Sequence, residues 1–354
     1  MKQILLAFSL LIATVFTACN EQKQEQEQAP KGVTVMIYSE YIDPAMIDDF
    51  EEKTGYKLHL ELYEAQEEMI GKLQSVGTSQ YDVIIASDVV IQQMVRLKLI
   101  SALDINRVPN RKNIATKFLN RPYDPSNTYT IPYLLGTTGI LYRDTTIAPD
   151  SVSYSMLFDS NQTKGSFSLL NESRSMLALT LLALGFDANS TNQDEINKAV
   201  ELLLKVKKDP HFIGFDGSVG GKEKVLSNMN WAAIVFNGDA QAAIDEDSTL
   251  QFAIPKEGSF MWADAMTLSS QAPNPDGAYA FMNYILDAEN GAQLAKYINY
   301  ASPNKASLRV IDSTYKNNRV INPPRETYAR LTFLKDPGDA AMMLDEAWTI
   351  VKIR

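Results

Sequence analysis

Aromatic and acidic side chains recur where the predicted strands of this chain end. Tyr38 and Tyr41 follow the first strand, and Ser87 ends another. Later strand ends add Phe236, Asp239, Trp262 and Asp264. In open α/β sheets, ligands bind beyond the carboxyl ends of the strands. Carboxylates neutralise cations and the faces of aromatic rings attract them, so these positions indicate a cleft for a cationic ligand.

An alternation of strands and helices positions these residues. The segments Val33–Ile37, Lys57–Tyr63 and Tyr81–Ala86 have strand patterns, and a helical pattern follows each one. This repetition predicts a parallel sheet with helices on both faces. An extended run punctuated by Pro and Gly then covers 123–142, and the alternation resumes after it.

Local signals predict where several helices begin. The expected starting residues are Asp43-Pro44, Ser87, Thr191 with Asp194 three residues later, and Asn274-Pro275. The glycines between 214 and 221 lack the strand-then-helix context of a nucleotide site and predict a loop. In the closing amphipathic helix, over 339–352, we expect Met342 and Met343 on the packed face.

Composition limits the class of protein. The net charge is −10 and the pI about 4.9, which argues against nucleic acid as a partner because that binding needs Lys and Arg to neutralise phosphates. A chain of 354 residues is too long to fold around a single hydrophobic core, so its length predicts two lobes. The two histidines, His59 and His211, are isolated, so no metal site is expected.

The first 31 residues predict an export signal followed by a tether. Met1-Lys2 precedes an apolar run, Ile4–Phe16, that is too short to span a bilayer, and Cys19 follows it. This pattern predicts a lipoprotein signal over residues 1–19, with lipid on Cys19. Residues 20–31 lack large apolar side chains and predict a flexible tether.

Several motifs in sequence order resemble the spermidine/putrescine-binding proteins of bacterial polyamine uptake systems. They are Phe50-Glu-Glu-Lys-Thr-Gly55, Tyr81-Asp-Val-Ile-Ile-Ala-Ser87, Leu103-Asp104 with Pro109-Asn110, the 124–142 run ending in Gly136-Thr-Thr-Gly-Ile-Leu-Tyr142, Pro255-Lys-Glu-Gly258 and Tyr300-Ala-Ser-Pro-Asn304. The resemblance covers nearly all of the chain after Val33.

The resemblance implies an α/β fold with two lobes, the type II periplasmic solute-binding fold, with the ligand cleft between two mainly parallel sheets flanked by helices. We expect residues 32–138 and 263–305 in the first lobe, and 139–262 and 306–354 in the second. It also implies a monomer without enzymatic activity or cofactor, which delivers a polyamine to an ABC permease in the inner membrane. The protein would lie in the periplasm or cell envelope, held to a membrane only by the lipid on Cys19.

The resemblance also assigns ligand-binding residues. Those expected to line the pocket are Tyr38, Tyr41, Ser87, Glu172, Phe236, Asp239, Trp262, Asp264 and Tyr300. Tyr38 and Phe236 occupy positions where relatives have Trp, and Glu172 one where they have Asp. Val89 and Ser175 replace an aromatic residue and a Glu that are common in the family, and Leu334 replaces a Gln of spermidine-type members. Three carboxylates suffice for a dication, so putrescine is favoured over spermidine.

Other functions remain open at this point. The same fold could hold another amine, a sugar or ferric ion, or serve as a polyamine sensor for a signalling receptor. Paired acids could also perform acid/base hydrolysis, although the sequence has no nucleophile elbow, metal-ligand triplet or phosphate loop. Glu172 and Asp239 lie at predicted helix starts, where an acid often has only a capping role.

Overall fold

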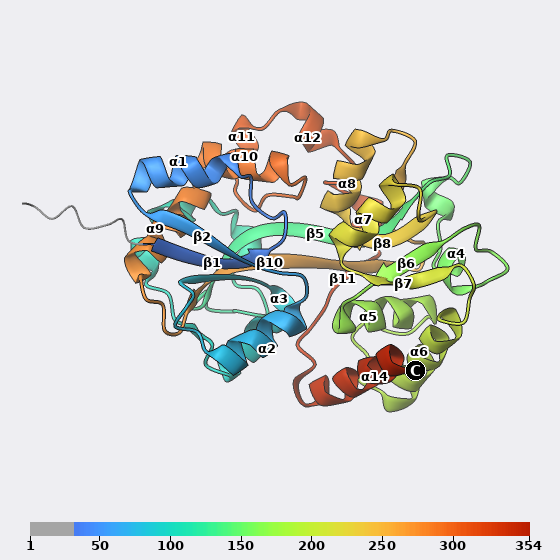
Figure 1. Cartoon of the computed structure of the whole chain (residues 1–354). Helices are drawn as coiled ribbons and strands as arrows, with labels where there is room; N and C mark the ends of the chain where they lie inside the picture. The colour runs from blue at the N-terminus through green and yellow to red at the C-terminus, as the bar shows by residue number, and fades with distance from the viewer. Residues whose placement is uncertain (1–31) are drawn as a thin grey trace, which may run out of the picture. The chain divides into compact units, whose positions relative to one another are not determined.

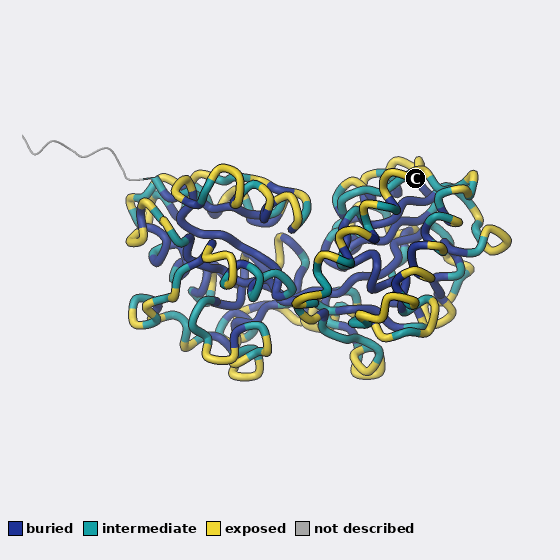
Figure 2. Tube along the Cα trace, turned by 90° about the horizontal axis from the view of Figure 1, so that it is seen from below, coloured by how far each residue is buried: buried dark blue, intermediate teal, exposed yellow. Residues whose placement is uncertain are grey.

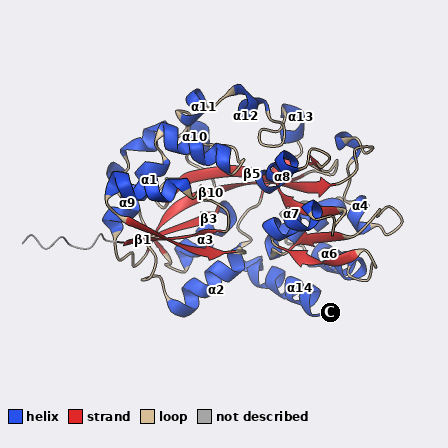
Figure 3. Cartoon of the chain, turned by 45° about the horizontal axis from the view of Figure 1, so that its top comes forward, coloured by secondary structure: helices blue, strands red, loops and turns tan. Residues whose placement is uncertain are grey.

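A computed structural model describes residues 32–354 of the chain (Figure 1). The predicted export signal, Cys19 and the predicted tether lie outside the described residues. The described part is an α/β fold with two lobes, and helices cover both faces of its strands (Figure 3).

The first lobe contains the sheet that the sequence predicts. Its strand order is β2-β1-β3-β10-β5, with β1 parallel to both β2 and β3, and β10 antiparallel to its neighbours β3 and β5. The strands are β1 (Gly32–Tyr38), β2 (Lys57–Tyr63), β3 (Val83–Ser87), β5 (Thr130–Tyr142) and β10 (Ser259–Ser269), with short β4 (Ile100–Ser101) paired to β10. Short β11 (Leu331–Phe333) pairs with the start of β10, which extends into the second lobe. Its helices are α1 (Ala45–Thr54), α2 (Gln66–Val76), α3 (Asp88–Arg96), α9 (Pro275–Ile285) and α10 (Ala288–Tyr297).

The second lobe repeats this arrangement. Strands β6, β7 and β8 are parallel, and the second half of β5 pairs antiparallel with β8. The strands are β6 (Phe167–Leu170), β7 (Phe212–Asp216), β8 (Ala232–Phe236) and β9 (Gln251–Ala253). The helices are α4 (Ser155–Phe158), α5 (Ser173–Ala183), α6 (Gln193–Val206), α7 (Ser218–Leu226), α8 (Asn237–Glu246) and α14 (Ala341–Ile353).

Short helices complete the connections. They are α11 (Ser307–Val310), α12 (Ser313–Asn317), α13 (Arg325–Tyr328), and the 3₁₀ helices at Ile105–Arg107, Pro109–Asn113, Thr116–Phe118, Pro149–Ser151 and Gly338–Ala340. The Lys296–Asp312 ion pair (2.7 Å) and the Tyr315 hydroxyl, which donates to the Tyr300 carbonyl, fasten α12 to the end of α10.

One strand belongs to both sheets. Every residue of β5 is buried; residues Thr130–Thr137 pair with β10, and residues Thr138–Tyr142 pair with β8. In Figure 2 the buried segments, in dark blue, run through each lobe and continue from one to the other. We propose lobe boundaries at 138/139 and 262/263, which fall within β5 and β10.

Glycine is required where β5 meets β10. A Cβ atom on Gly136 would overlap the ring of Trp262, which pairs with it across the two strands. The absence of a side chain at Gly136 therefore lets the Trp262 indole lie flat over the centre of the sheet.

Most predicted helix starts are confirmed, but two capping details are wrong. Asn274 accepts a hydrogen bond from the Gly277 amide (3.1 Å), as expected of a cap. The cap of α6 is Asn192, whose side chain accepts from two following amides, and not Thr191. Ser87 is at the N-cap position of α3, but its hydroxyl donates to Asp88 (3.1 Å) and caps no amide.

Two further expectations are also wrong. The segment that contains Gly220 and Gly221 is helical, because Gly221 packs α7 closely against Ala233 and Val235 of β8, and this contact outweighs the low helix propensity of glycine. In α14, Met342 is 70% exposed and only Met343 packs against the core.

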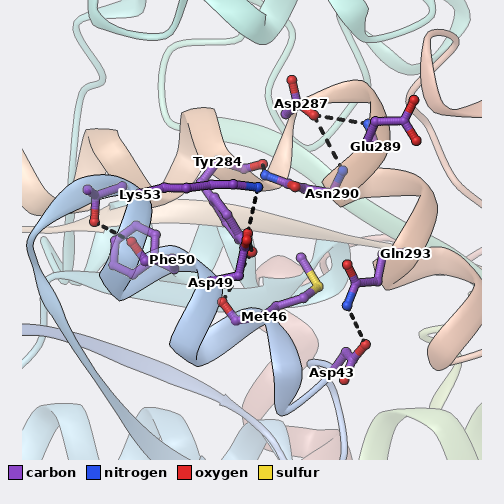
Figure 4. A network of polar contacts seen from close by, with 11 residues as sticks. Asp43, Met46, Asp49, Phe50, Lys53, Tyr284, Asp287, Glu289, Asn290 and Gln293 are labelled. Carbon is purple, nitrogen blue, oxygen red and sulfur yellow. Dashed lines mark hydrogen bonds and ion pairs between the residues drawn. The ribbon is translucent and has the colours of Figure 1, made fainter.

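A polar network fixes α1 against α9 and α10 (Figure 4). The Tyr284 hydroxyl donates to Asp49 (2.6 Å), and the Gln293 amide donates to Asp43 (2.7 Å). Because Asp43 lies two residues after Tyr41, the network also fixes the segment that follows β1. Among residues 32–354, no helix has the length and apolar character needed to cross a membrane.

Candidate functional site

A cavity of about 440 Å³ lies between the carboxyl ends of strands from both lobes. All nine residues expected at the site line it: Tyr38, Tyr41, Ser87, Asp264 and Tyr300 from the first lobe, Glu172, Phe236 and Asp239 from the second, and Trp262 at the proposed boundary between them. Val89, Ser175 and Leu334, where the chain departs from the family pattern, line it too. The structure thus brings the predicted set together; that these residues contact a ligand stays a prediction.

Five aromatic rings form a continuous row in the cavity. Tyr38 contacts Tyr41 (5.8 Å between ring centroids), Tyr41 contacts Tyr300 (5.6 Å), Tyr300 contacts Trp262 (5.0 Å), and Trp262 contacts Phe236 (5.5 Å). All four contacts are edge-to-face, the arrangement that ring quadrupoles favour. The row supplies flat apolar walls whose ring faces attract positive charge.

Asp264 reaches the cavity because of its place on β10. Trp262 and Asp264 are two residues apart, so they point to the same face of the strand. The pairing of β10 with β5 shifts just after Asp264, where Ala265 lies opposite Pro132. Pro132 has no N–H for the ladder, and such an irregularity changes the direction of side chains.

The Asp264 carboxyl is 3% exposed. Burial raises its pKa to about 7, a rise that the nearby Tyr41 and Ser87 hydroxyls partly offset. The Tyr41 hydroxyl is buried and has no hydrogen-bond partner among the described residues. Asp264 is therefore a buried acid with acceptor capacity left over for a ligand.

Glu172 occupies the N-cap position of α5 without capping it. Its backbone is extended, and its side chain accepts from the Ser175 hydroxyl (2.8 Å) and the Tyr38 hydroxyl (3.5 Å). Burial, followed by the charge of Glu67, raises the pKa of Glu172 to about 8. The capping function belongs instead to Glu67 of the first lobe, which accepts from the Ser173 amide (3.2 Å).

Asp239 lies in the first turn of α8, beside Tyr300. The Tyr300 hydroxyl donates to it (3.3 Å), and the Ser218 hydroxyl donates to the same oxygen while accepting from the Phe236 amide (2.8 Å). Burial raises the pKa of Asp239, although these donors and a nearby lysine oppose the rise. A Cβ on Gly238 would overlap the Tyr300 ring, so glycine permits this contact.

Sequence reasoning missed four residues at the cavity. They are Asp88, Gln66, Lys222 and Glu40. Asp88 directly follows Ser87, so the strand-end criterion could have found it. The Gln66 amide donates to the hydroxyls of Tyr38 and Tyr63, and its own oxygen is buried without a partner. No sequence signal identifies Lys222, because it lies within the glycine-rich segment that predicted a loop.

Lys222 connects the lobes. Its ammonium group pairs with Glu40 of the first lobe (2.8 Å) and with Glu223 (3.3 Å). Burial opposes the charged form, but the Glu40 hydrogen bond and the charge of Asp239 outweigh it and raise the pKa of Lys222. The cavity therefore contains one fixed cation, near Asp239.

The buried acids of the cavity have no ion-pair partner among residues 32–354, although the charge of Lys222 acts on Asp239. Within the part of the chain that the structure describes, no ion pair involves Asp88, Glu172, Asp239 or Asp264. Burying a charged carboxylate is costly without a paired charge. Residues 32–354 hold no cluster of His, Cys, Asp and Glu fit for a metal ion. The cavity therefore contains buried acids whose charge a cationic ligand could neutralise.

The chain is similar to known solute-binding proteins. The family model described as bacterial extracellular solute-binding protein matches residues 45–321. The spermidine/putrescine-binding periplasmic protein of Salmonella typhimurium is 27% identical over 315 residues, which cover 89% of this chain and 90% of the relative. The putrescine/cadaverine-binding protein of Pseudomonas aeruginosa is 30% identical over 358 residues, covering 98% and 99%.

Solved structures agree with these relatives. A structure from Listeria monocytogenes superposes with a TM-score of 0.84 at 28% identity and covers 91% of this chain and 99% of its own. The spermidine/putrescine ABC transporter substrate-binding protein of Streptococcus pneumoniae gives 0.73 at 28% identity, with the same coverage. The two-lobed fold expected from the sequence is confirmed. The chain belongs to the bacterial extracellular solute-binding proteins, a family of transport proteins, and within it to the spermidine/putrescine-binding group.

Proposed function

We propose that this protein is the extracytoplasmic binding component of an ABC uptake system and captures a polyamine between its lobes. One observation carries the proposal: buried carboxylates without ion-pair partners share a cavity with a row of five aromatic rings. A polyamine presents ammonium groups joined by methylene stems. Each ammonium needs carboxylate acceptors once it leaves water, and each stem packs against a flat ring.

Among polyamines, we favour putrescine over spermidine. Ser175 provides no carboxylate and instead donates to Glu172, and Lys222 already supplies one positive charge beside Asp239. Both features lower the number of ammonium groups that the ligand must bring. Two relatives from Pseudomonas aeruginosa are named for binding putrescine with cadaverine or with agmatine.

Binding is coupled to closure in this proposal. Several contacts join groups from different lobes, among them Tyr38 with Glu172, Glu67 with the Ser173 amide, and Glu40 with Lys222. The proposed ligand-binding residues also come from both lobes, so a bound amine adds contacts only when the lobes approach. Ligand would then shift an open–closed equilibrium toward the closed form.

We further propose that the protein acts as a monomer in the periplasm or cell envelope and is anchored by lipid on Cys19. Its macromolecular partner would be the permease of the uptake system in the inner membrane. Globomycin-sensitive processing and labelling by radioactive palmitate test the anchor, with Cys19→Ser as the control that should lose both.

Titration calorimetry of the purified protein tests the ligand. Putrescine, cadaverine, spermidine and spermine are the candidates, and maltose and ferric citrate are the controls for other ligand classes of this fold. We expect micromolar or tighter binding of a diamine, weaker binding of spermidine and no heat with the controls. No heat with any amine would refute the proposed function and leave the fold assignment unchanged.

A further inference from the structure

Asp88 is an acid of the cavity to which neither the family resemblance nor the comparisons assign a function. It is the first residue of α3, is 5% exposed and lines the cavity beside Ser87. The Ser87 hydroxyl donates to its Oδ1 (3.1 Å), and the nearby backbone amides of Ala263 and Val89 favour its charged form.

Asp264 approaches the same serine from the neighbouring strand. In the antiparallel pair of β10 with β3, Asp264 lies directly opposite Ser87, and the Ser87 hydroxyl also stabilises its charged form. Two buried carboxyl groups therefore flank one hydroxyl, and neither has an ion-pair partner within residues 32–354. Two carboxyl groups that face the same hydroxyl disfavour each other's ionisation in the absence of a cation.

An acid at a helix N-terminus often interacts only with the helix dipole, and that role would favour ionised Asp88. Here the opposite holds, since burial and then the charge of Asp264 raise the pKa of Asp88 to about 8. The dipole and the donated hydrogen bonds are therefore too weak to keep this carboxyl ionised beside Asp264. Its position on the cavity wall instead makes it available to a ligand.

We propose that Asp88 and Asp264 act as a pair that binds one ammonium end of the ligand, and that the pair gives up a proton when the ammonium arrives. In the empty cavity the pair shares one acidic proton. When the R–NH₃⁺ group binds, the carboxyl O–H bond breaks, the proton passes to buffer, and both carboxylates accept hydrogen bonds from the ammonium. This inference rests on the proposed function and identifies how one end of the amine is recognised.

Other titratable groups face this pair. Tyr38, Tyr41, Tyr63 and Tyr133 surround Asp264, and burial raises each of their pKa values well above the usual range, so they keep their protons near neutral pH. Tyr123 and, beyond it, Arg121 lie on the side of Asp88; burial raises the pKa of Tyr123 also. Glu172 is the other acid near Asp264 that could exchange a proton, so the test must separate it.

The test is titration of putrescine at pH 7 in buffers with different heats of ionisation. The slope of observed heat against buffer heat gives the number of protons released. We compare the wild type, Asp88→Asn, Glu172→Gln and Asp345→Asn. Asp345 is a matched control, because burial raises its pKa while it lies outside this cavity.

We expect proton release from the wild type, a clear fall in that release for Asp88→Asn, and putrescine binding at least about tenfold weaker in that variant. Asp345→Asn should match the wild type, and Glu172→Gln should keep the release that belongs to the pair. If Asp88→Asn releases as many protons as the wild type, or binds putrescine equally well, the inference is overturned while the proposed function stands. If the wild type binds no amine, both the inference and the proposed function are refuted.

Folding of the variant is checked separately. Because Asn removes a buried acid, empty Asp88→Asn should melt at or above the wild-type temperature at pH 8. If it does not fold, Asp88→Ser takes its place, and the affinity of the wild type between pH 6 and 8 gives a second measure. That affinity should rise with pH if the pair must release a proton, and a flat profile would also overturn the inference.

Discussion

At the scale of single residues, the acids of the cavity differ in how much of their acceptor capacity is already used. Glu172 accepts from Ser175 and from Tyr38. Asp264 has the Tyr41 and Ser87 hydroxyls nearby, but Tyr41 makes no full hydrogen bond. An incoming ammonium therefore gains more from Asp264 than from Glu172.

We predict that Asp264→Ala weakens amine binding more than Glu172→Ala does. Loss of a buried carboxylate that contacts an ammonium costs about 2 kcal/mol or more, about thirtyfold in affinity. Loss of the partly engaged Glu172 should cost about 1 kcal/mol, about fivefold. Calorimetry with the preferred amine measures both, and equal or reversed losses would contradict the ranking.

The sequence identified most of the acids and rings of the cavity, but not the contacts that hold them and offset their charge. Strand-end position and family resemblance find Asp264, Trp262 and Tyr300, because strand ends converge at one edge of a sheet. The contacts of Lys222 with Glu40, and of Glu67 with the Ser173 amide, join segments more than a hundred residues apart. Such contacts arise only when the lobes are folded and placed together, so no local sequence pattern predicts them.

At the scale of elements, the start of α8 sets the position of one wall. Gly238 lies so close to the Tyr300 ring that a Cβ atom on it would overlap the ring. The same Cβ atom would lie 2.6 Å from the Ile298 carbonyl oxygen. Tyr300 in turn donates to Asp239. The Tyr300 ring therefore contacts both the start of the helix and its acid.

We predict that Gly238→Ala displaces Tyr300 and weakens amine binding about tenfold, because overpacking of this kind costs about 1–3 kcal/mol. Gly71→Ala is the matched control. Gly71 lies within α2 with open space around its Cβ position, so alanine should leave binding unchanged and stabilise the helix by up to about 1 kcal/mol. Equal binding by both variants would show that Tyr300 does not need this contact.

The ends of helices could be predicted from the sequence where residues next to the helix end determine them. Gly55 ends α1 with a positive φ of 72°, and Asn274 caps α9, both as the sequence indicates. Prediction failed where tertiary packing decides: α7 keeps two glycines because it lies tightly on β8, and α6 takes its cap from Asn192.

At the scale of the whole molecule, the buried acids make stability depend on pH. The pKa values of Asp88 and Glu172 rise to about 8 and that of Asp264 to about 7 because of burial. Between the ordinary carboxyl pKa of about 4 and these values, the folded state binds more protons than the unfolded state. The free energy of unfolding therefore decreases as pH rises through this window.

We predict that the melting temperature of the empty protein falls by a few degrees from pH 5 to pH 8, and that saturating putrescine removes much of this fall. Acids with lowered pKa, such as Asp144 and Asp247 at about 2, act only below this window. Scanning calorimetry across pH measures the change. A melting temperature that rises from pH 5 to 8 in the empty protein would contradict it.

The order of strands in the first lobe also determines when that lobe can fold. β10 lies between β3 and β5, and Asp264 pairs with Ser87 far upstream. The sheet therefore lacks a central strand until synthesis has passed Ser269, about three-quarters of the way along the chain. The first sheet of a nascent chain therefore stays incomplete for most of its synthesis.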